Sequence, residues 1–169
     1  MPSTQVALNT SRPQHKSPST QVALNTSRPS RGNGEPRRPY TLLNADFHIT
    51  VLSRKGGNSK LNAHPNLTIK EVDFAFVAWL SPVLLGVQVV ISCLATLAIG
   101  SQNPLLDASI TAGVKRFIPA EFGMDCQNTL CVELPVCAPE TATQKCLLEN
   151  SSANPELTYT AIVNRLFLD

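Results

Sequence analysis

The sequence predicts an α/β protein in which a parallel sheet carries helices on both faces. From Phe47 onward, short apolar runs rich in β-branched residues alternate with stretches of helical length. One run, residues 87–94, is apolar almost throughout, which is typical of a parallel strand buried on both faces. Strands that alternate with helices favour a parallel sheet. The length of 169 residues accommodates one domain and a tail, and it excludes two large domains.

The predicted elements follow one another in a regular order along the chain. Strands are expected at residues 47–53, 67–72, 87–94, 114–118 and 157–163, and helices at 74–85, from Pro104 to Gly113 and at 141–149. Pro104 favours a helix start, since proline at the first helical position gives up only an amide that would lack a partner anyway. Gly113 ends that helix, because glycine readily adopts the conformation of a helix terminus.

Residues 1–40 differ in composition from the rest of the chain. They hold six Lys and Arg residues against one acidic residue, Glu35, and six of the 13 prolines. Large aliphatic residues are too few to offset an ordering entropy of roughly 1–2 kcal/mol per residue, so we expect a disordered basic tail. The segment PSTQVALNTSRP occurs twice in it, at 2–13 and 18–29. The tail has no clustered run of cations interleaved with aromatic residues, and we expect no nucleic-acid partner.

The cysteine pattern and the start of the chain bear on metal binding and location. The five cysteines are Cys93, Cys126, Cys131, Cys137 and Cys146. They form no CxxC pair, and no histidine stands at zinc-finger spacing, so we expect no metal site. The chain opens without the charged and apolar regions of a secretory leader. We therefore expect free thiols in a reducing compartment and a cytoplasmic protein.

The stretch from residue 74 to residue 106 contains no charged side chain, and two structures can explain it. Residues 74–100 are long enough for a single membrane span. Pro82, Gly86 and the β-branched cluster after Gly86 favour instead a short helix followed by a strand. That helix, 74–85, would be apolar around most of its circumference, with Phe76, Trp79, Leu80, Leu84 and Leu85. It would leave an exposed apolar patch, which favours a protein partner.

Three segments resemble one known family, namely residues 47–55, 88–96 and, above all, 101–125. The run AGVKRFIPAEFG in the last segment is similar to a specific signature of the NmrA-like, isoflavone-reductase-like proteins. The resemblance covers residues 41–169. It implies an incomplete Rossmann-like, doubly wound parallel sheet, truncated at both ends relative to the family and without its C-terminal substrate lobe. Members of the family bind NADP; some reduce small aromatic or quinone-like substrates, and others bind the dinucleotide without turnover.

The resemblance also implies where a cofactor would bind. In the family, an arginine directly after the second strand receives the 2′-phosphate of NADP, and Arg54, followed by Lys55, stands at this position. The segment after the fourth strand of the family passes close to the nicotinamide and its ribose. Here this segment comprises Ser92, Cys93, Leu94 and Ala95. Both segments also have a simpler interpretation, as a basic surface turn and as a strand end.

The glycine-rich loop of the family is degraded in this chain. A Rossmann fingerprint needs three glycines between the first strand and the first helix, for a tight turn, for the approach of the pyrophosphate and for helix packing. Only Gly32 and Gly34 stand in this region, among three prolines. Residues 20–24 resemble a vestige of the first strand, and residues 42–45 the end of the first helix. We expect NADP binding to be weak or lost, with Gly32 as the remaining candidate contact of this loop.

The catalytic position of the family is also changed. Reductases of the family carry a lysine at the start of the helix before the last strand of this half, and Glu140 stands at the matching position. A carboxylate there reverses the local charge and cannot act as a cationic proton donor. Lys145 lies five positions after Glu140 and therefore on another face of the helix. We expect Glu121 to support the structure of its turn and not to act as an acid. The resemblance therefore implies no catalytic residue in this chain, and it does not identify a substrate.

Four accounts of function remain open from the sequence. The first is an NAD(P)-binding protein of NADPH-dependent oxidoreductase ancestry whose catalysis is impaired. The second is a non-catalytic module that senses a dinucleotide or binds a protein partner through the 74–85 helix. The third is a single-span membrane protein through residues 74–100. The perfect duplication beside a broken glycine loop also suggests a degenerate reductase fragment.

Overall fold

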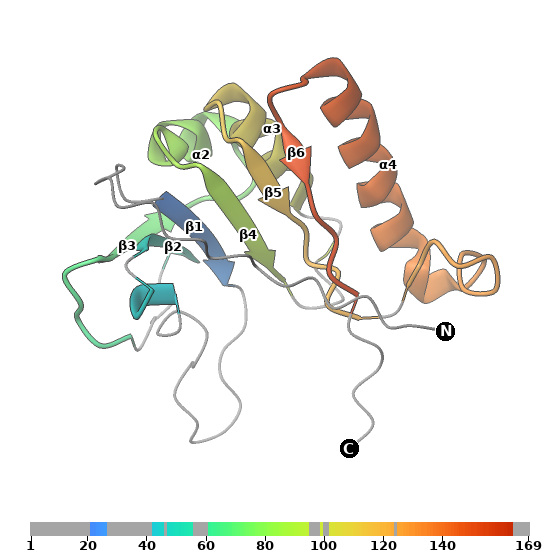
Figure 1. Ribbon diagram of the computed structural model, residues 1–169, viewed down its shortest axis with the longest axis horizontal. Helices are drawn as coiled ribbons and strands as arrows, with labels where there is room; N and C mark the ends of the chain where they lie inside the picture. Colours follow the sequence, from blue (N-terminus) through green and yellow to red (C-terminus); the bar gives the residue numbers. More distant parts are fainter. Residues whose placement is uncertain are drawn as a thin grey trace.

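The computed structural model describes residues 21–26, 42–45, 47–55, 61–94, 99, 102–123 and 125–163. Within these ranges six strands form one parallel sheet in the order β3-β2-β1-β4-β5-β6 (Figure 1). The strands are β1 (Gln21–Thr26), β2 (His48–Arg54), β3 (Leu67–Val72), β4 (Val89–Cys93), β5 (Arg116–Ile118) and β6 (Thr158–Tyr159). This order, with β1 between β2 and β4, is that of the doubly wound dinucleotide-binding fold. It confirms the predicted Rossmann-like α/β class.

The helices between the strands lie where the sequence predicts them, with shifted ends. They are α2 (Val77–Leu84), α3 (Asn103–Thr111), the 3-10 helix η2 (Pro135–Cys137) and α4 (Ala138–Ala153). Strand ends shift too, and β6 is much shorter than the predicted 157–163. The reason is its place at the edge of the sheet, where it pairs with β5, itself a strand of three residues.

Strand β1 lies inside the segment 1–40, for which the sequence suggests a disordered tail. Gln21–Thr26 form a strand instead, and they include most of the suggested vestige at 20–24. The reason is pairing on both sides, because β1 forms parallel ladders with β2 and with β4, and Ala23 is fully buried between them. Such ladders supply hydrogen bonds that local composition does not reveal. Residues 1–20 and 27–41, with the rest of the suggested tail, lie outside the described residues.

Helix α2 is short, and the chain turns sharply after it. Leu85 has φ −59° and ψ 127°, Gly86 has φ +78°, and the Val87 amide donates to the Leu84 carbonyl at 3.0 Å. These values are those of a type II turn, which requires the positive φ that glycine adopts. The turn leads into β4, so the apolar stretch is a helix followed by a central strand. A helix at Val77–Leu84 and a strand at Val89–Cys93 thus stand where the alternative interpretation placed one continuous span. Among the described residues no helix is long and apolar enough to cross a membrane.

Helix α3 begins and ends as the sequence predicts. Pro104 lies in its first turn, and Gly113, with φ +74°, follows its end. The Val114 amide donates to the Ser109 carbonyl at 3.0 Å, and the Gly113 amide donates to the Ile110 carbonyl at 3.1 Å. This pair of bonds is the Schellman motif, which satisfies the last carbonyls of a helix. The chain then enters β5, which pairs with β4.

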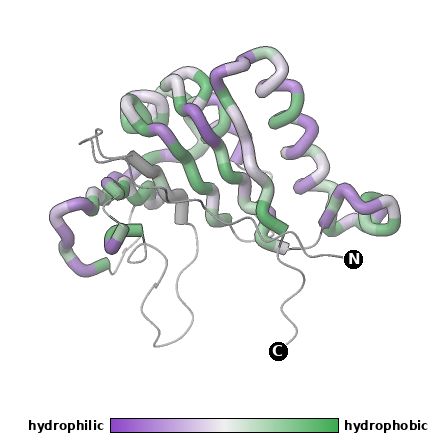
Figure 2. The backbone as a smooth tube through the Cα atoms, viewed as in Figure 1, coloured by the Kyte–Doolittle hydropathy of each residue, from purple (hydrophilic) through white to green (hydrophobic). Residues whose placement is uncertain are grey.

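The sheet has an apolar cluster on each face. The larger cluster joins the strands to α2, α3 and α4, through buried residues that include Leu80, Leu84, Leu105, Leu106, Phe117 and Leu147. The smaller cluster lies on the other face, around Leu43, Ile49 and Val51. Val90 of β4 belongs to the first cluster, while Val89 and Ile91 pack against the second, as side chains of one strand alternate between faces. Figure 2 shows hydrophobic residues along β4 and hydrophilic residues along much of α4.

Candidate functional site

The carboxyl ends of β2, β1 and β4 lie side by side at one edge of the sheet. β1 runs between its two neighbours, with Asn25 in register with Leu52 of β2 and with Ser92 of β4. Thr26, the last residue of β1, is in register with Cys93. In doubly wound sheets, ligands bind outside the carboxyl ends of the strands at the point where the strand order reverses. That point is here the end of β1, between β2 and β4.

The described cofactor candidates form two groups, one on each side of β1. The first group is Arg54, which ends β2, and Lys55, which follows it in a turn; both side chains are exposed. The second group ends β4 and comprises the buried Ser92 with the partly buried Cys93 and Leu94. The other two candidates, Gly32 and Ala95, lie outside the described residues.

Two buried hydroxyl groups at this edge lack hydrogen-bond partners among the described residues. They are Ser53 Oγ, one residue before the end of β2, and Ser92 Oγ, one residue before the end of β4. Burying a hydroxyl group without a partner costs free energy, so buried polar atoms are nearly always paired with protein, water or a ligand. The two atoms therefore mark the carboxyl edge as a place where further polar atoms would be stabilising.

A buried network of polar side chains fixes the neighbouring edge, where β5 ends and α4 begins. Gln102, directly before α3, accepts a bond from the Ala120 amide at 3.1 Å and donates to Thr143 Oγ1 at 3.5 Å. Gln144 of α4 donates to a carboxylate oxygen of Glu121. The network therefore joins the start of α3, the loop after β5 and the first turns of α4. Sequence reasoning missed Gln102, Thr143 and Gln144, because their partners lie 18 to 41 residues away and no local pattern marks them.

Glu121 and Glu140 lie close together within this region. Burial raises the pKa of the Glu121 carboxyl, the hydrogen bond from Gln144 opposes the rise, and the negative charges of Glu140 and Asp125 add to it. Glu140 lies in the first turn of α4, where the helix dipole favours a negative charge. Glu121 Oε1 and Glu140 Oε2 are buried and have no hydrogen-bond partner among the described residues.

Lys145 lies on the solvent-exposed side of α4. Its side chain is exposed on α4, and its Nζ lies 4.0 Å from Glu149 Oε1, one turn further along the helix. An exposed pair of this kind contributes little to stability, since solvent screens both charges. The first turn of α4 presents the carboxylate of Glu140.

Two thiols meet beside this carboxylate pair. Cys126 Sγ and Cys137 Sγ are 2.7 Å apart, and both residues are buried. Burial raises the pKa of the Cys126 thiol to about 12, and the contact with Cys137 adds to the rise. Sequence reasoning missed this contact because 11 positions separate the two cysteines and neither belongs to a CxxC motif. No group of three or more His, Cys, Asp or Glu side chains in the described part of the chain could hold a metal ion.

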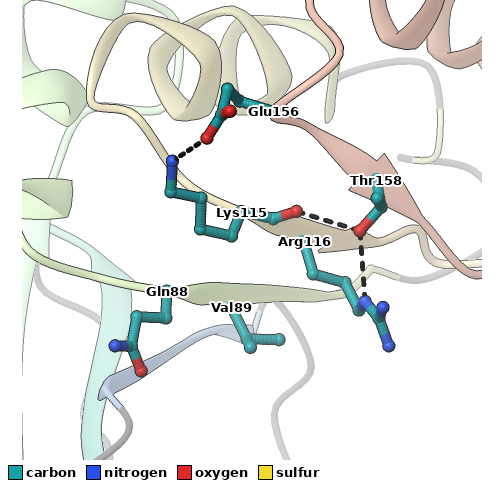
Figure 3. A pocket seen from close by; sticks show the side chains of 6 residues that line it. All are labelled: Gln88, Val89, Lys115, Arg116, Glu156 and Thr158. Atoms are coloured by element: carbon teal, nitrogen blue, oxygen red, sulfur yellow. Dashed lines mark hydrogen bonds and ion pairs between the residues drawn. The ribbon is translucent and has the colours of Figure 1, made fainter. Parts of the chain in front are cut away.

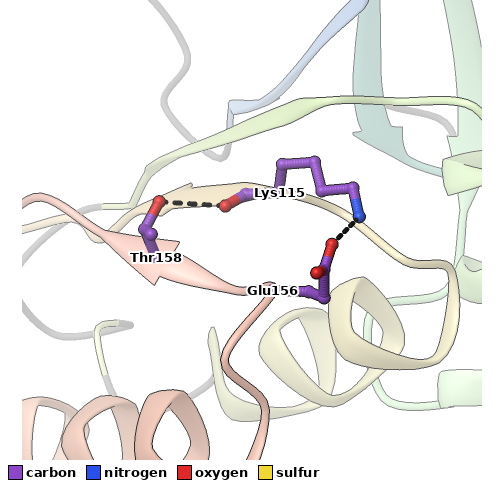
Figure 4. Close-up of polar contacts among 3 residues, drawn as sticks. All are labelled: Lys115, Glu156 and Thr158. Carbon is purple, nitrogen blue, oxygen red and sulfur yellow. Dashed lines mark hydrogen bonds and ion pairs between the residues drawn. The ribbon is translucent and has the colours of Figure 1, made fainter.

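An open pocket of about 430 Å³ lies at the opposite, amino edge of the sheet (Figure 3). Its lining residues are Gln88, Val89, Lys115, Arg116, Glu156 and Thr158. Lys115 pairs with Glu156 and lowers the pKa of that carboxyl, while Thr158 Oγ1 donates to the Lys115 carbonyl at 2.9 Å (Figure 4). Arg116 Nε donates to Thr158 Oγ1 at 3.2 Å. Because the pocket lies away from the strand-order reversal, we place the candidate site at the carboxyl edge.

The apolar surface predicted on the 74–85 helix is present in part. Leu80 and Leu84 are fully buried in the core cluster beneath the helix. Phe76, Trp79 and Leu85 remain exposed, with 66% of Trp79 accessible to solvent. Packing on one side of α2 explains the division, because a helix that covers a sheet buries a single face. We call Phe76, Trp79 and Leu85 the α2 apolar surface.

Comparisons with known proteins agree with this fold. A family model described as the NmrA-like family matches residues 40–144, more than half of the chain. The chain is 41% identical over 83 residues to the oxidoreductase aprR of Aspergillus flavus, an alignment that covers 48% of this chain and 27% of that protein. It is 43% identical over 68 residues to the isoflavone reductase homolog IRL of Zea mays, which covers 40% of this chain and 22% of that protein. The chain thus matches less than a third of the length of these curated relatives.

Solved structures extend the likeness across the sheet. A ternary complex of leucoanthocyanidin reductase from Vitis vinifera superposes with a TM-score of 0.65 and 20% identity, over 85% of this chain and 46% of that chain. The structure of AtPrR2 with NADP+ and (+)pinoresinol superposes with a TM-score of 0.61 and 24% identity, over 86% of this chain and 49% of that chain. At these identities the likeness shows the fold alone. Because the family model matches more than half of the chain, the chain belongs to the NmrA-like family, a family of NAD(P)-binding oxidoreductases with a Rossmann-like fold.

Proposed function

We propose that this chain binds NADP(H) across the carboxyl edge of the sheet, with the 2′-phosphate beside Arg54 and Lys55 and the nicotinamide half beside residues 92–94. The observation that carries this proposal is the strand register, because β1 ends between these two groups at the reversal of strand order. A guanidinium group and an ammonium group that are exposed at one turn supply the charge that a phosphate needs. Solved relatives with NADP+ or NADPH support the choice of cofactor.

The residues present fit a dinucleotide in part. Ser53 Oγ and Ser92 Oγ are buried polar atoms that a ligand or its water molecules would pair. Against tight binding, the chain has only Gly32 and Gly34 between β1 and β2, one glycine fewer than the three of a complete fingerprint. We therefore propose weak binding.

We further propose that the chain does not transfer hydride to a carbonyl substrate. Glu140 places a carboxylate, not a cation, in the first turn of α4, and the nearby Lys145 lies on the exposed side of the helix. A second carboxylate, Glu121, adds negative charge to the same place. An alkoxide that develops during reduction would be destabilised there. Assays with NADPH and a panel of quinones and aromatic ketones should show no substrate-dependent NADPH oxidation, and turnover would contradict this part of the proposal.

The binding proposal is tested by comparing two arginines at opposite edges of the sheet. Thermal unfolding of the full chain is followed with millimolar NADPH and with millimolar NADH, for the unchanged protein, Arg54→Gln and Arg116→Gln. Ligand at about 100 times its Kd stabilises a protein by roughly 2.7 kcal/mol, which is a shift of several degrees for a domain of this size. We expect NADPH to raise Tm more than NADH does.

The two variants should differ in how much more NADPH than NADH raises their Tm. Arg54→Gln should weaken the preference for NADPH, because glutamine removes the guanidinium charge at the end of β2 and leaves only the charge of Lys55. Arg116→Gln should retain the preference, since this arginine lies at the amino edge, bonded to Thr158. Equal shifts with both nucleotides in the unchanged protein, or loss of the preference in Arg116→Gln alone, would contradict the proposed position of the 2′-phosphate.

We also propose a second function, that the α2 apolar surface binds a protein partner. The observation that favours it is the exposure of Phe76, Trp79 and Leu85 within and at the two ends of one short helix, since exposed large apolar side chains are common in interaction sites. A photoreactive amino acid placed at position 76 should crosslink a partner in cells. The same substitution at Leu148, an equally exposed apolar residue of α4, is the matched control and should not. Equal crosslinking at both positions would contradict the proposal.

A further inference from the structure

We propose that Cys126 and Cys137 form a disulfide-bonding site, a dithiol that a low-molecular-weight disulfide such as glutathione disulfide oxidises to an intramolecular disulfide. The first support is the distance between the two sulfur atoms, 2.7 Å. The S–S bond of a disulfide is about 2.05 Å long, so the two sulfurs need to approach by only about 0.7 Å. Neither the family membership nor the proposed cofactor site requires this pair.

The place of the two residues in the fold provides the second support. Cys126 lies in the loop that follows β5, and Cys137 ends η2 directly before α4. The two sulfurs thus bring together the two ends of one surface loop, 11 positions apart. Its middle is exposed, with 85% of Leu130 accessible to solvent, so the loop holds little core packing that a change at its ends would disturb.

The other cysteines have different surroundings. Cys131 lies in the middle of the loop and is partly buried. Cys146 lies on α4, where Asn150 Nδ2 donates to its sulfur at 3.4 Å, and Cys93 ends β4. Five cysteines allow ten pairs, and the contact between their sulfur atoms predicts that Cys126 and Cys137 form the disulfide.

The reaction balances as a thiol–disulfide exchange. One cysteine of the pair, as thiolate, attacks a sulfur of glutathione disulfide; the S–S bond of the reagent breaks, and the departing glutathione thiolate takes up the proton. The second cysteine then attacks the mixed disulfide, which forms the Cys126–Cys137 bond and releases the second glutathione as a thiol. The protein loses two electrons and two protons, and one glutathione disulfide becomes two glutathiones.

The burial of both thiols slows this exchange. Only 4% of Cys126 and none of Cys137 is exposed, and the raised pKa of Cys126 disfavours its thiolate. The loop must therefore open before the first attack. We expect the exchange to be slower than at an exposed thiol, and the product, once formed, to be shielded from reduction by the same burial.

The test treats the full, folded chain with millimolar glutathione disulfide and maps its peptides by mass spectrometry. We expect one intramolecular link, Cys126 to Cys137, and a count of titratable thiols that falls by two. Closing a loop of this length should raise Tm by roughly 5–10 °C, and dithiothreitol should reverse the rise. A link that involves Cys131, or oxidation of other cysteines while Cys126 and Cys137 remain free thiols, would overturn the proposal.

Two cysteine variants test the order of the two exchange steps. Cys137→Ser should leave Cys126 as a mixed disulfide with glutathione, since the second step has lost its nucleophile. Cys146→Ser, the matched control on α4, should still form the link at an unchanged rate. Peptide mapping of the unchanged protein decides the question even where a serine variant does not fold.

Discussion

Glu121 is a carboxyl group that folding removes almost completely from water, since only 4% of the residue is exposed. Gln144 stabilises one oxygen of its charged form, but burial and the charges of Glu140 and Asp125 outweigh this bond and raise the pKa. The folded protein therefore holds the Glu121 proton more tightly than the unfolded chain does. The resulting stability is present at low pH and is lost as the pH rises from the ordinary value of 4.5 through the raised pKa.

Glu121→Gln removes this titration, and its effect should depend on pH. A glutamine stays neutral and keeps an oxygen that can accept the bond from Gln144. The free energy of unfolding of Glu121→Gln, relative to the unchanged protein, should therefore rise as the pH increases from 4.5 toward neutrality. Urea denaturation at a series of pH values measures this difference.

Glu156→Gln is the matched control for this prediction. Lys115 lowers the pKa of Glu156, so the stability that this exposed carboxylate contributes is lost as the pH falls below 4.5. The difference between Glu156→Gln and the unchanged protein should be constant above 4.5 and should change only below it. A pH-independent difference for Glu121→Gln would show that its carboxyl titrates alike in the folded and unfolded states.

At the scale of the element, the end of α3 depends on one backbone conformation. Gly113 has φ +74°, and a β-carbon at this position would meet no atom within 4 Å. Gly113→Ala therefore isolates the cost of a left-handed backbone for an L-residue, about 1–2 kcal/mol. We expect the free energy of unfolding to fall by this amount, measured by urea denaturation.

Gly123 provides the control for the same substitution. A β-carbon there also meets no atom within 4 Å, and its φ lies outside the left-handed range. Gly123→Ala should leave stability unchanged or raise it by up to about 1 kcal/mol, because alanine restricts the unfolded chain. Equal losses for both variants would mean that the positive φ of Gly113 is not the cause.

The elements also show how far local patterns reach. The predicted strand at 67–72 is β3, and the helix bounded by Pro104 and Gly113 is α3, because periodicity and helix-end residues act over a few positions. The predicted strand at 157–163 is reduced to Thr158–Tyr159, since the length of an edge strand is set by its one neighbour. The length of β6 is thus set by its pairing with β5 and not by its own sequence pattern.

At the scale of the whole molecule, stability rests on the apolar cluster between the sheet and α2, α3 and α4. Leu106 of α3 is fully buried in this cluster. Leu106→Ala should lower the free energy of unfolding by about 2–5 kcal/mol, through lost burial and the cavity that remains. Leu130→Ala, on the exposed loop after β5, should change it by no more than about 0.5 kcal/mol. Denaturation of both variants under one set of conditions checks the contrast, and similar losses would contradict this location of the core.

The topology of the sheet decides which residues can act together. Arg54 and Ser92 are separated by β1, and β1 comes from a segment whose composition suggested a tail. Without β1, β2 and β4 would have no common neighbour, and the two groups of cofactor candidates would not share an edge. The assignment of these residues to NADP(H) stays a prediction that the Arg54 experiment tests.

The sequence by itself determined the α/β class, most strands and helices, the glycine that ends α3 and the family. These features depend on residues that are close in the chain or on a contiguous signature. Only the tertiary structure decided that Gln21–Thr26 form the central strand, that Gln102 and Gln144 bond the loop after β5, and that Cys126 meets Cys137. Each of these depends on partners brought from 11 or more positions away by the packing of the sheet, and hydrogen bonds and contacts over such separations leave no periodic trace in the sequence.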